Sequence, residues 1–237
     1  MISSLRDPVL LPTPILSLRP TQMTLGMNEV RVKRIAWKEK TADDLTKFLA
    51  AHMVPVIIGP KGEPYLIDHH HLARALYEEG LKSVFVTVVA DLSRLPADHF
   101  WNMMAFNGWV HPYDSKGRRR PYSELPKTVK SMEDDPYRSL AGELRAVGGY
   151  AKDTSPFSEF LWADFLRPRI KPKAIKADFA AALTKALVMA KTPEADYLPG
   201  WSGPHTYMQR ASAKAKGQKR KGKGKAAGPA PSSPATE

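Results

Sequence analysis

The run Asp-His-His-His in the first third of the chain carries the residue types best suited to binding phosphate. An apolar stretch ends at Ile67, and Asp68 follows it in a position to cap a helix. His69, His70 and His71 then open that helix. The first backbone N–H groups of a helix lack intrahelical partners and, with the positive end of the helix dipole, bind anions. The sequence therefore predicts a phosphate-binding turn, with His70 as its leading phosphate ligand or acid/base.

Arg74 lies on the same predicted helix, at a spacing that brings it near two of the imidazoles. It follows His70 by four residues and His71 by three, so these side chains can converge on one ligand, with a phosphate favoured. A metal held by three consecutive histidines is disfavoured, because neighbouring helical residues point about 100° apart. A structural alternative stays open, in which Asp68 only caps the helix and the histidines are exposed polar residues.

Short strands and helices must position this turn. We expect an α+β fold, a small mixed β-sheet with helices, in the order strand, helix, strand, strand, helix, strand. Residues 27–37 place Val30 and Val32 on one face and are predicted as a strand. Gly80 is well placed to end the helix that carries the histidines. The remaining predicted elements are a helix at 41–53, a hairpin around the turn GPKGEP at 59–64, and a buried strand at 82–92.

Composition and periodicity divide the chain into four parts. The second half has helical periodicity, so its Trp, Met and Phe residues around 101–109 are interpreted mainly as core, with pocket lining as the alternative. The expected parts are an extended N-terminal arm at 1–14, an α/β core at 15–92, a helical extension packed on that core at 93–205, and a disordered Lys-rich tail at 206–237.

Positive charge is concentrated at the C-terminal end. Residues 211–237 hold seven basic residues and one acid, a net charge of +6, which is half of the formal +12 of the whole chain. This segment lacks large apolar residues and cannot offset the entropy of ordering. It would bind nucleic acid through counterion release without reading sequence. The basic residues concerned are Lys214, Lys216, Lys219, Arg220, Lys221, Lys223 and Lys225.

Composition also excludes several classes of protein. The chain has 237 residues, enough for a sizeable core, and no cysteine, which excludes disulfide frameworks, thiol nucleophiles and Cys-ligated zinc. No stretch approaches the roughly 18 apolar residues of a membrane-spanning helix, and Asp7 with the nearby prolines argues against a secretory signal. We therefore expect no membrane partner and neither zinc nor a redox cofactor.

The segment GEPYLIDHHHLARALYEEGL, followed by VFVTVV, resembles the ParB/sulfiredoxin superfamily, in which a strand runs into a phosphate-contacting motif and a helix. The segments LRPTQMTLGMNEV, DDPYRSLAG and FSEFLWADFLR narrow the resemblance to the ParB-like nuclease family, whose members carry DGHH- or DHHH-type motifs. It covers roughly residues 15–190 and implies a ParB/sulfiredoxin-like core in a cytoplasmic bacterial protein. Chromosome partitioning is not implied, because the GERR-type motif of partitioning proteins is absent and no helix-turn-helix is evident.

Relatives with a DGHHR-type motif on this fold include a nucleotide-dependent free serine kinase. The resemblance therefore implies that the residues from Asp68 to His71 face the phosphates of a nucleotide, with Mg²⁺ and ATP or ADP as cofactors. Such an enzyme needs a carboxylate that accepts the proton of the substrate hydroxyl. Glu29 is the first candidate, and an exposed strand glutamate is the alternative interpretation. Asp68 is the candidate ligand for Mg²⁺.

The segment DDPYRSLAG supplies a second group of candidates. Pro136 after two acids is typical of a helix start, so Asp134 and Asp135 are interpreted as capping residues. Arg138 would contact phosphate or hold Asp68 in place if its helix packs beside the histidine turn.

Two acids and an arginine run have open roles. Glu159 and Asp164 lie among aromatic residues and are either partly buried with a partner or on the outer face of a helix. The run from Arg118 to Arg120 is interpreted as a solvated turn.

Three functions remain open from the sequence. The first is an enzyme, a phosphotransferase or phosphoester hydrolase that binds a nucleotide or phosphorylated ligand at the histidine turn. The second is a non-catalytic DNA- or RNA-binding accessory protein, in which the tail supplies affinity and the turn grips a backbone phosphate. The third is a family member that keeps the fold only as an interaction module.

Overall fold

The computed structural model describes residues 11–39 and 41–204. Its main sheet has five strands in the order β1-β6-β4-β5-β2. β6 pairs antiparallel with β1 and parallel with β4, while β5 pairs antiparallel with β4 and parallel with β2. The strands are β1 Leu11–Pro14, β2 Arg19–Pro20, β4 Val54–Ile58, β5 Pro64–Leu66 and β6 Ser83–Asp91, and a separate parallel pair is formed by β3 Thr24–Leu25 and β7 Glu133–Asp134.

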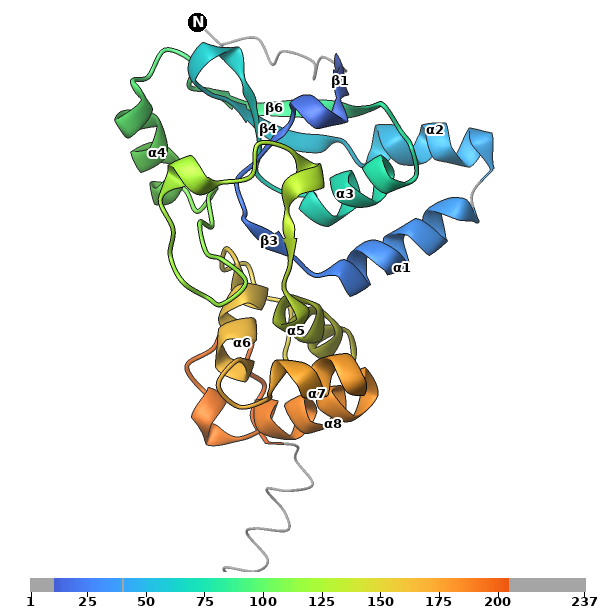
Figure 1. Cartoon of the computed structure of the whole chain (residues 1–237), viewed down its shortest axis with the longest axis vertical. Helices are drawn as coiled ribbons and strands as arrows, with labels where there is room; N and C mark the ends of the chain where they lie inside the picture. Colours follow the sequence, from blue (N-terminus) through green and yellow to red (C-terminus); the bar gives the residue numbers. More distant parts are fainter. Residues whose placement is uncertain (1–10, 40, 205–237) are drawn as a thin grey trace, which may run out of the picture.

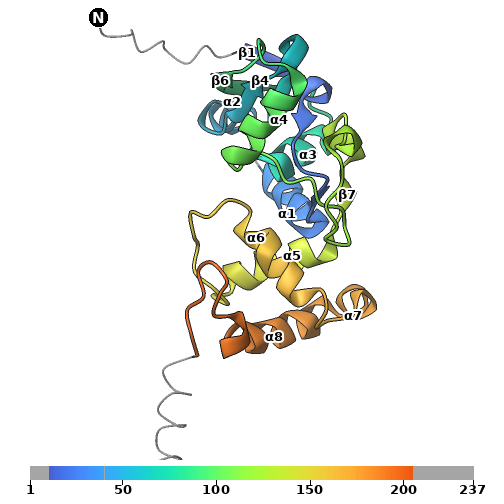
Figure 2. The same ribbon diagram turned by 90° about the vertical axis from the view of Figure 1, so that its left-hand side faces the viewer.

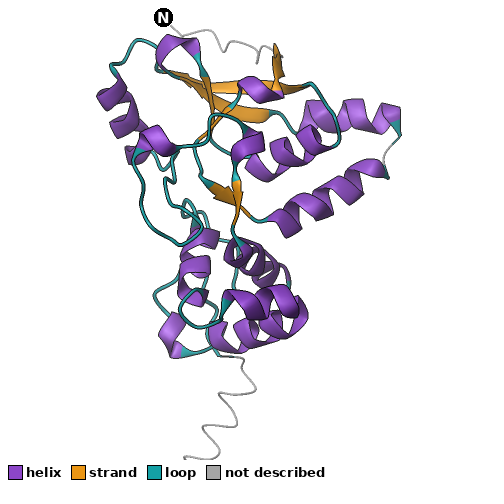
Figure 3. Cartoon of the chain, viewed as in Figure 1, coloured by secondary structure: helices purple, strands orange, loops and turns teal. Residues whose placement is uncertain are grey.

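Helices surround the sheet and make up the rest of the described chain (Figure 1). The α-helices are α1 Met27–Lys38, α2 Ala42–Ala51, α3 His70–Glu78, α4 Ala97–Phe106, α5 Pro136–Ala146, α6 Ser158–Leu166, α7 Pro172–Ala177 and α8 Phe179–Ala190. The 3-10 helices are η1 Ile15–Ser17, η2 Pro60–Gly62, η3 Tyr122–Glu124, η4 Val129–Ser131 and η5 Pro193–Ala195. The predicted α+β fold class is confirmed, with strands in the upper part of Figure 3 and helices alone in the lower part.

The two largest of the hydrophobic clusters in the described residues form one core in each part of the molecule. In the sheet core, Val56 of β4, Leu66 of β5 and Leu76 of α3 pack together. The helical core is centred on Trp162 and Leu140, which pack α5 and α6 against α8. In both Figure 1 and Figure 2, α7 and α8 lie at the end of the molecule opposite the main sheet.

Residues 27–37 lie in α1, so the predicted strand there is wrong. On a strand, Val30 and Val32 would share a face, but the structure buries Val30 completely and leaves Val32 63% exposed. Ile35, three residues after Val32 and so outside the alternation, is 55% exposed. The pattern misleads because the apolar side chains of Val32 and Ile35 face outward and do not mark the buried face of the segment.

The other predicted elements around the turn are confirmed. The helix at 41–53 is α2, and the hairpin is the antiparallel pair β4 and β5. Gly80 follows α3 with a φ of 85°, the left-handed conformation that glycine tolerates. The strand at 82–92 is β6, although Val88 and Val89 near its end are about half exposed rather than buried.

The N-terminal segment enters the sheet early. The strand β1 begins at Leu11 and pairs along β6, while residues 1–10, in the expected arm, lie outside the described residues. The Lys-rich tail also lies outside them. Among the described residues, no helix has both the length and the apolar character required to cross a membrane.

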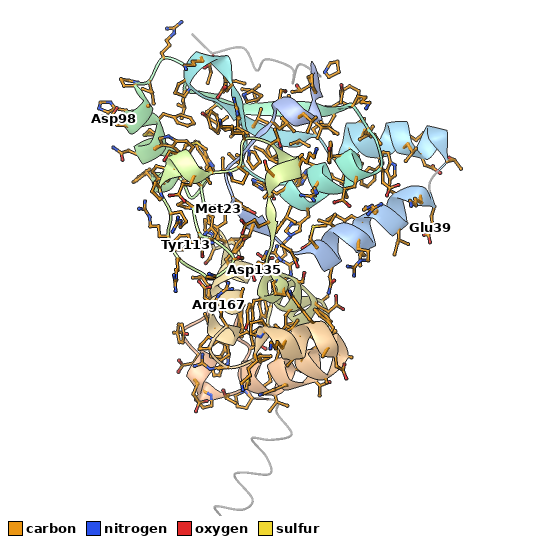
Figure 4. All side chains as sticks on the ribbon, viewed as in Figure 1. Met23, Glu39, Asp98, Tyr113, Asp135 and Arg167 are labelled. Atoms are coloured by element: carbon orange, nitrogen blue, oxygen red, sulfur yellow. The ribbon has the colours of Figure 1, made fainter. Side chains whose placement is uncertain are left out.

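Asp135 joins the two parts of the molecule. Its Oδ1 accepts a hydrogen bond from the backbone N–H of Tyr137 at 2.9 Å, which confirms its predicted role as the N-cap of α5. Its Oδ2 accepts from Nη2 of Arg167 at 2.8 Å, and this carboxylate is only 1% exposed. Arg167 also donates to the backbone carbonyl of Ser115 at 2.6 Å. The two charged side chains meet at the junction of the upper and lower parts (Figure 4).

Replacing Asp135 with alanine should destabilise the fold by about 2–4 kcal/mol, because α5 would lose its cap and the Arg167 guanidinium would keep only the more exposed Asp164 as a counter-charge. Urea unfolding followed by circular dichroism measures this. Asp98→Ala is the matched control, since the Asp98 side chain is 76% exposed, and it should change stability by less than about 0.5 kcal/mol. Equal unfolding midpoints for the two variants would contradict the role given to Asp135.

Candidate functional site

A cavity of about 840 Å³ opens between the sheet part and the helical part. Its walls come from α1, from the turn before α3, from α5, and from the start of α6. The sequence-predicted residues on these walls are Glu29, Asp68, His69, His70, His71 and Arg138. The structure therefore brings together side chains from positions more than one hundred residues apart.

The histidine turn differs by one residue from its predicted geometry. The N-cap of α3 is His69, in the left-handed conformation with a φ of 62°, so the prediction of Asp68 as N-cap is wrong. The Asp68 carboxylate instead accepts the backbone N–H of His69 at 2.6 Å and is exposed. Within the described structure, no side chain forms a capping hydrogen bond to the first turn of α3, so the N–H groups of that turn lack a capping acceptor.

Two imidazoles of the turn are buried and bonded to the N-terminal segment. His70 is 2% and His71 is 7% exposed, so the alternative of exposed polar histidines is wrong for these two. Nε2 of His70 lies 3.3 Å from the backbone nitrogen of Thr21, which donates to it. Nε2 of His71 accepts the backbone N–H of Gly26 at 2.9 Å. The segment leading into α1 is thus fastened to the turn.

Burial keeps these histidines neutral. Burial, opposed in part by a hydrogen bond at Leu66, lowers the pKa of His70 to about 3. Burial and then the charge of Arg138 hold the pKa of His71 well below its usual value. Burial also lowers the pKa of His69, which the neighbouring Asp68 opposes. At neutral pH these rings carry no charge, so Nε2 of His70 and of His71 can accept hydrogen bonds.

Arg138 is the main buried charge of the cavity. The residue is 8% exposed, and its Nη1 lies 3.4 Å from Oε2 of Glu29. Its Nε atom is buried without a hydrogen-bond partner among the described residues. Its guanidinium also lies over the ring of Phe160, with Cζ 5.4 Å from the ring centroid. A buried guanidinium normally uses all its donors, so the described residues leave one donor of Arg138 unused.

Glu29 lies between three basic side chains. Its Oε2 is 3.6 Å from Nε2 of His71 and 3.4 Å from Nη1 of Arg138. Its Oε1 is 3.7 Å from Nζ of Lys33, one turn further along α1. The carboxylate is one-third exposed, on the cavity side. Its sequence-based alternative, an exposed strand glutamate, is wrong because this segment is helical.

Arg74 lies away from this group. Its Nη1 donates to the backbone carbonyls of Val129, Lys130 and Met132 at 3.0, 3.0 and 3.2 Å, and its Nε donates to Glu78 at 2.7 Å. The structure therefore does not bring Arg74 beside His70, and this guanidinium ties α3 to η4. The seven basic tail residues from Lys214 to Lys225 lie outside the described residues.

Other cavity residues come from the α5 and α6 side. Glu159 forms an ion pair with Arg145. Burial raises the pKa of Glu159, but the charges of Arg138 and Arg145 and its own backbone N–H outweigh this and hold the pKa below its usual value. Trp109 also lines the cavity. For this residue the structure agrees with pocket lining, the alternative interpretation of the aromatic residues around 101–109. The sequence marked Glu159 as an acid in an apolar helix, but it gave no signal for Arg145.

Two further titratable residues lie behind or away from the cavity. Burial, followed by the charge of Arg138, lowers the pKa of His111 to about 4. Its ring is packed against Tyr113 and Phe160, with centroids 4.6 and 4.1 Å away. Asp164 does not line the cavity, and burial raises its pKa although Arg167 opposes the shift. No sequence pattern pointed to His111.

Comparisons with known proteins match most of the chain. A family profile described as "Putative ParB-like nuclease" matches residues 11–168, which includes every sequence-predicted residue on the cavity walls. The crystal structure of protein Atu1540 from Agrobacterium tumefaciens is similar, with a TM-score of 0.76 and 47% sequence identity over 83% of this chain and 99% of that chain. No curated protein matches.

Acid should destabilise the fold through its buried histidines. Between pH 6.5 and the lowered pKa values of His70, His71 and His111 the unfolded chain binds more protons than the folded chain. Stability should be full above pH 6.5 and fall as the pH drops toward about 4, by up to about 1.4 kcal/mol per pH unit for each histidine. Urea midpoints between about pH 7.5 and about pH 5 measure this loss.

His111→Phe should make the pH dependence less steep, because an apolar ring fits among the same aromatic neighbours and binds no proton. His99→Gln is the control and should leave it unchanged, since the His99 side chain is 67% exposed. A midpoint that does not move with pH in the unsubstituted chain would contradict the burial of neutral imidazoles.

Proposed function

The chain belongs to the ParB-like nuclease family, and from this premise we propose that its cavity binds a phosphorylated small molecule of nucleotide size and catalyses phosphoryl transfer to a hydroxyl group. The observation that carries the proposal is Arg138, a buried guanidinium whose Nε has no partner among the described residues and which lines the same cavity as the start of α3, a helix without a side-chain cap. A helix N-terminus with a guanidinium next to it is a site suited to phosphate.

Charge at the turn supports binding of a phosphate rather than a neutral group. The dipole of α3 and the guanidinium of Arg138 both favour an anion. Lys33 lines the same cavity from α1 and adds a further positive charge. In this proposal His70 holds the turn against Thr21 and takes no part in proton transfer, because its Nε2 accepts a backbone N–H and its pKa is about 3.

Cavity size restricts the ligand. A volume of about 840 Å³ lies within the range of sites for cofactors and small molecules, roughly 300–1,000 Å³. Aromatic side chains contribute to the lining, with Trp37 on α1, Phe48 on α2, Trp109 after α4 and Phe157 just before α6. A single nucleotide, with one charged end and one flat apolar end, matches these walls better than a bare phosphate does.

The chemical step falls to Glu29. The hydroxyl oxygen of the acceptor forms a bond to phosphorus while the bond to the leaving oxygen breaks, and the Glu29 carboxylate takes the hydroxyl proton. Water as the acceptor gives hydrolysis, and an organic hydroxyl gives a kinase reaction.

Mg²⁺ fits a carboxylate on the cavity wall. It usually binds through one or two carboxylates plus the phosphates of a substrate, and Asp68, exposed on the cavity wall, is the residue that would hold it. When bound, Mg²⁺ neutralises charge on the phosphate oxygens.

Titration calorimetry of Mg·ADP into the full-length chain tests the binding. Arg138→Gln should weaken affinity at least tenfold, about 1.4 kcal/mol, because it removes the buried cation facing the phosphate. Arg31→Gln is the matched control, since Arg31 is exposed and donates a hydrogen bond to Asn28 on its own helix, outside the cavity, and it should bind like the parent chain. Moderate salt, about 0.15 M or more, suppresses nonspecific binding by the tail.

Absence of saturable binding in the parent chain would refute the nucleotide proposal. Salt-sensitive binding of DNA that disappears when the Lys-rich tail is deleted would then favour the accessory-protein alternative. If Arg138→Gln does not fold, Lys33→Gln on the exposed side of the same cavity should still weaken binding, by about threefold.

Glu29→Gln should separate chemistry from binding. The amide cannot take the hydroxyl proton, so turnover with ATP and a panel of hydroxyl acceptors, or water, should fall by about 10²–10⁴-fold. Affinity for Mg·ADP should stay within about threefold. The control is Glu39→Gln, at the exposed far end of α1 (Figure 4), which should not change turnover. Unaltered turnover in Glu29→Gln would exclude Glu29 as the base.

A further inference from the structure

The first amides of α1 are satisfied by side chains from three other elements. The N–H of Gly26 donates to Nε2 of His71 on α3 at 2.9 Å. The N–H of Met27 donates to Oδ1 of Asp134 on β7 at 3.0 Å, and the N–H of Asn28 donates to Oγ of Ser139 on α5 at 3.2 Å. The N-cap residue, Gly26, has no side chain that could accept these hydrogen bonds. The capping side chains therefore come from residues distant in the sequence.

His71 is chemically suited to be one of these caps. Its ring is buried and neutral at neutral pH, because burial and then the positive charges of Arg138 and Lys33 disfavour the imidazolium and lower the pKa. The other charged group facing it is Glu29, whose Oε2 lies 3.6 Å from Nε2. A neutral imidazole that accepts at Nε2 carries its proton on Nδ1.

Little room exists for α1 to shift while these contacts hold. A Cβ atom added at Gly26 would lie 2.8 Å from the backbone nitrogen of Ser139, so the start of α1 rests directly on α5. Glu29 follows within the first turn of the same helix. The position of its carboxylate beside Arg138 therefore depends on where the start of α1 is held.

We infer that His71 is a positioning residue: its Nε2 fixes the start of α1 and so places the Glu29 carboxylate in the cavity. This role differs from contact with phosphate, which the sequence alone suggested for His71. The inference concerns the ligand-free fold, and it rests on the proposed function only for its effect on turnover.

Two amide substitutions of His71 separate this role from a general loss of packing. His71→Gln carries an acceptor about as far from the backbone as Nε2, whereas the acceptor of His71→Asn is too short to reach Gly26. In ligand-free full-length protein, the Gly26 amide of His71→Asn should exchange with solvent at least about tenfold faster, as for a lost hydrogen bond. The amides of α8, in the other core, should not change, and His71→Gln should restore most of the protection.

Turnover gives the second readout. His71→Asn should lower kcat about tenfold or more with KM within about twofold, and His71→Gln should recover most of kcat. Three results would overturn the inference. The Gly26 amide could exchange equally fast in the parent chain and in His71→Asn, or exchange could become faster everywhere, including α8. The third result is an unchanged kcat in a variant whose Gly26 amide has lost its hydrogen bond. If the parent chain has no turnover, the proposed reaction fails, and exchange alone decides the role of His71.

If His71→Asn does not fold, a measurement on the parent chain tests the inference instead. A long-range ¹H–¹⁵N spectrum at about pH 7 should show His71 with its proton on Nδ1 and an unprotonated Nε2. A proton on Nε2 would overturn the inference, because that atom could not then accept from Gly26.

Discussion

Burying the guanidinium of Arg138 imposes conditions on every group around it. A charge taken out of water must be compensated by nearby acceptors or by an anion. Glu29 supplies the nearest anion at 3.4 Å, and the same positive field contributes to the low pKa values of His70, His71 and His111. Imidazoles that stay neutral can accept backbone N–H groups. One buried cation therefore links the electrostatics of the cavity to the hydrogen bonds that shape its walls.

Local sequence signals predicted the elements whose determinants are local. The hairpin of β4 and β5, the helix α3 and the left-handed glycine after it follow from turn residues and helical spacing within a few positions. The helix α1 was missed because its N-terminal caps come from α3, β7 and α5. No window of sequence around residues 27–37 contains that information.

The candidate site was predicted in part for the same reason. The sequence predicted Glu29, the histidine turn and Arg138 as site residues because each has an ionisable side chain in a recognisable segment. The structure places them on one cavity. The prediction for Arg74 was wrong because spacing along a helix shows which side chains share a face but not what packs against that face. In the structure, the Arg74 guanidinium contacts backbone carbonyls of η4. His111 required knowledge of packing between α6 and the loop after α4.

The neighbouring residues Asp134 and Asp135 serve different halves of the molecule. Asp134 bonds the start of α1, while Asp135 caps α5 and forms an ion pair with Arg167, the residue that follows α6. Their side chains leave one short extended segment and bond to different parts of the molecule. The backbone of this segment therefore sets the distance between the two cores. Inserting or deleting one residue in this segment would move both carboxylates away from their partners, so the length of the connection matters as much as its composition.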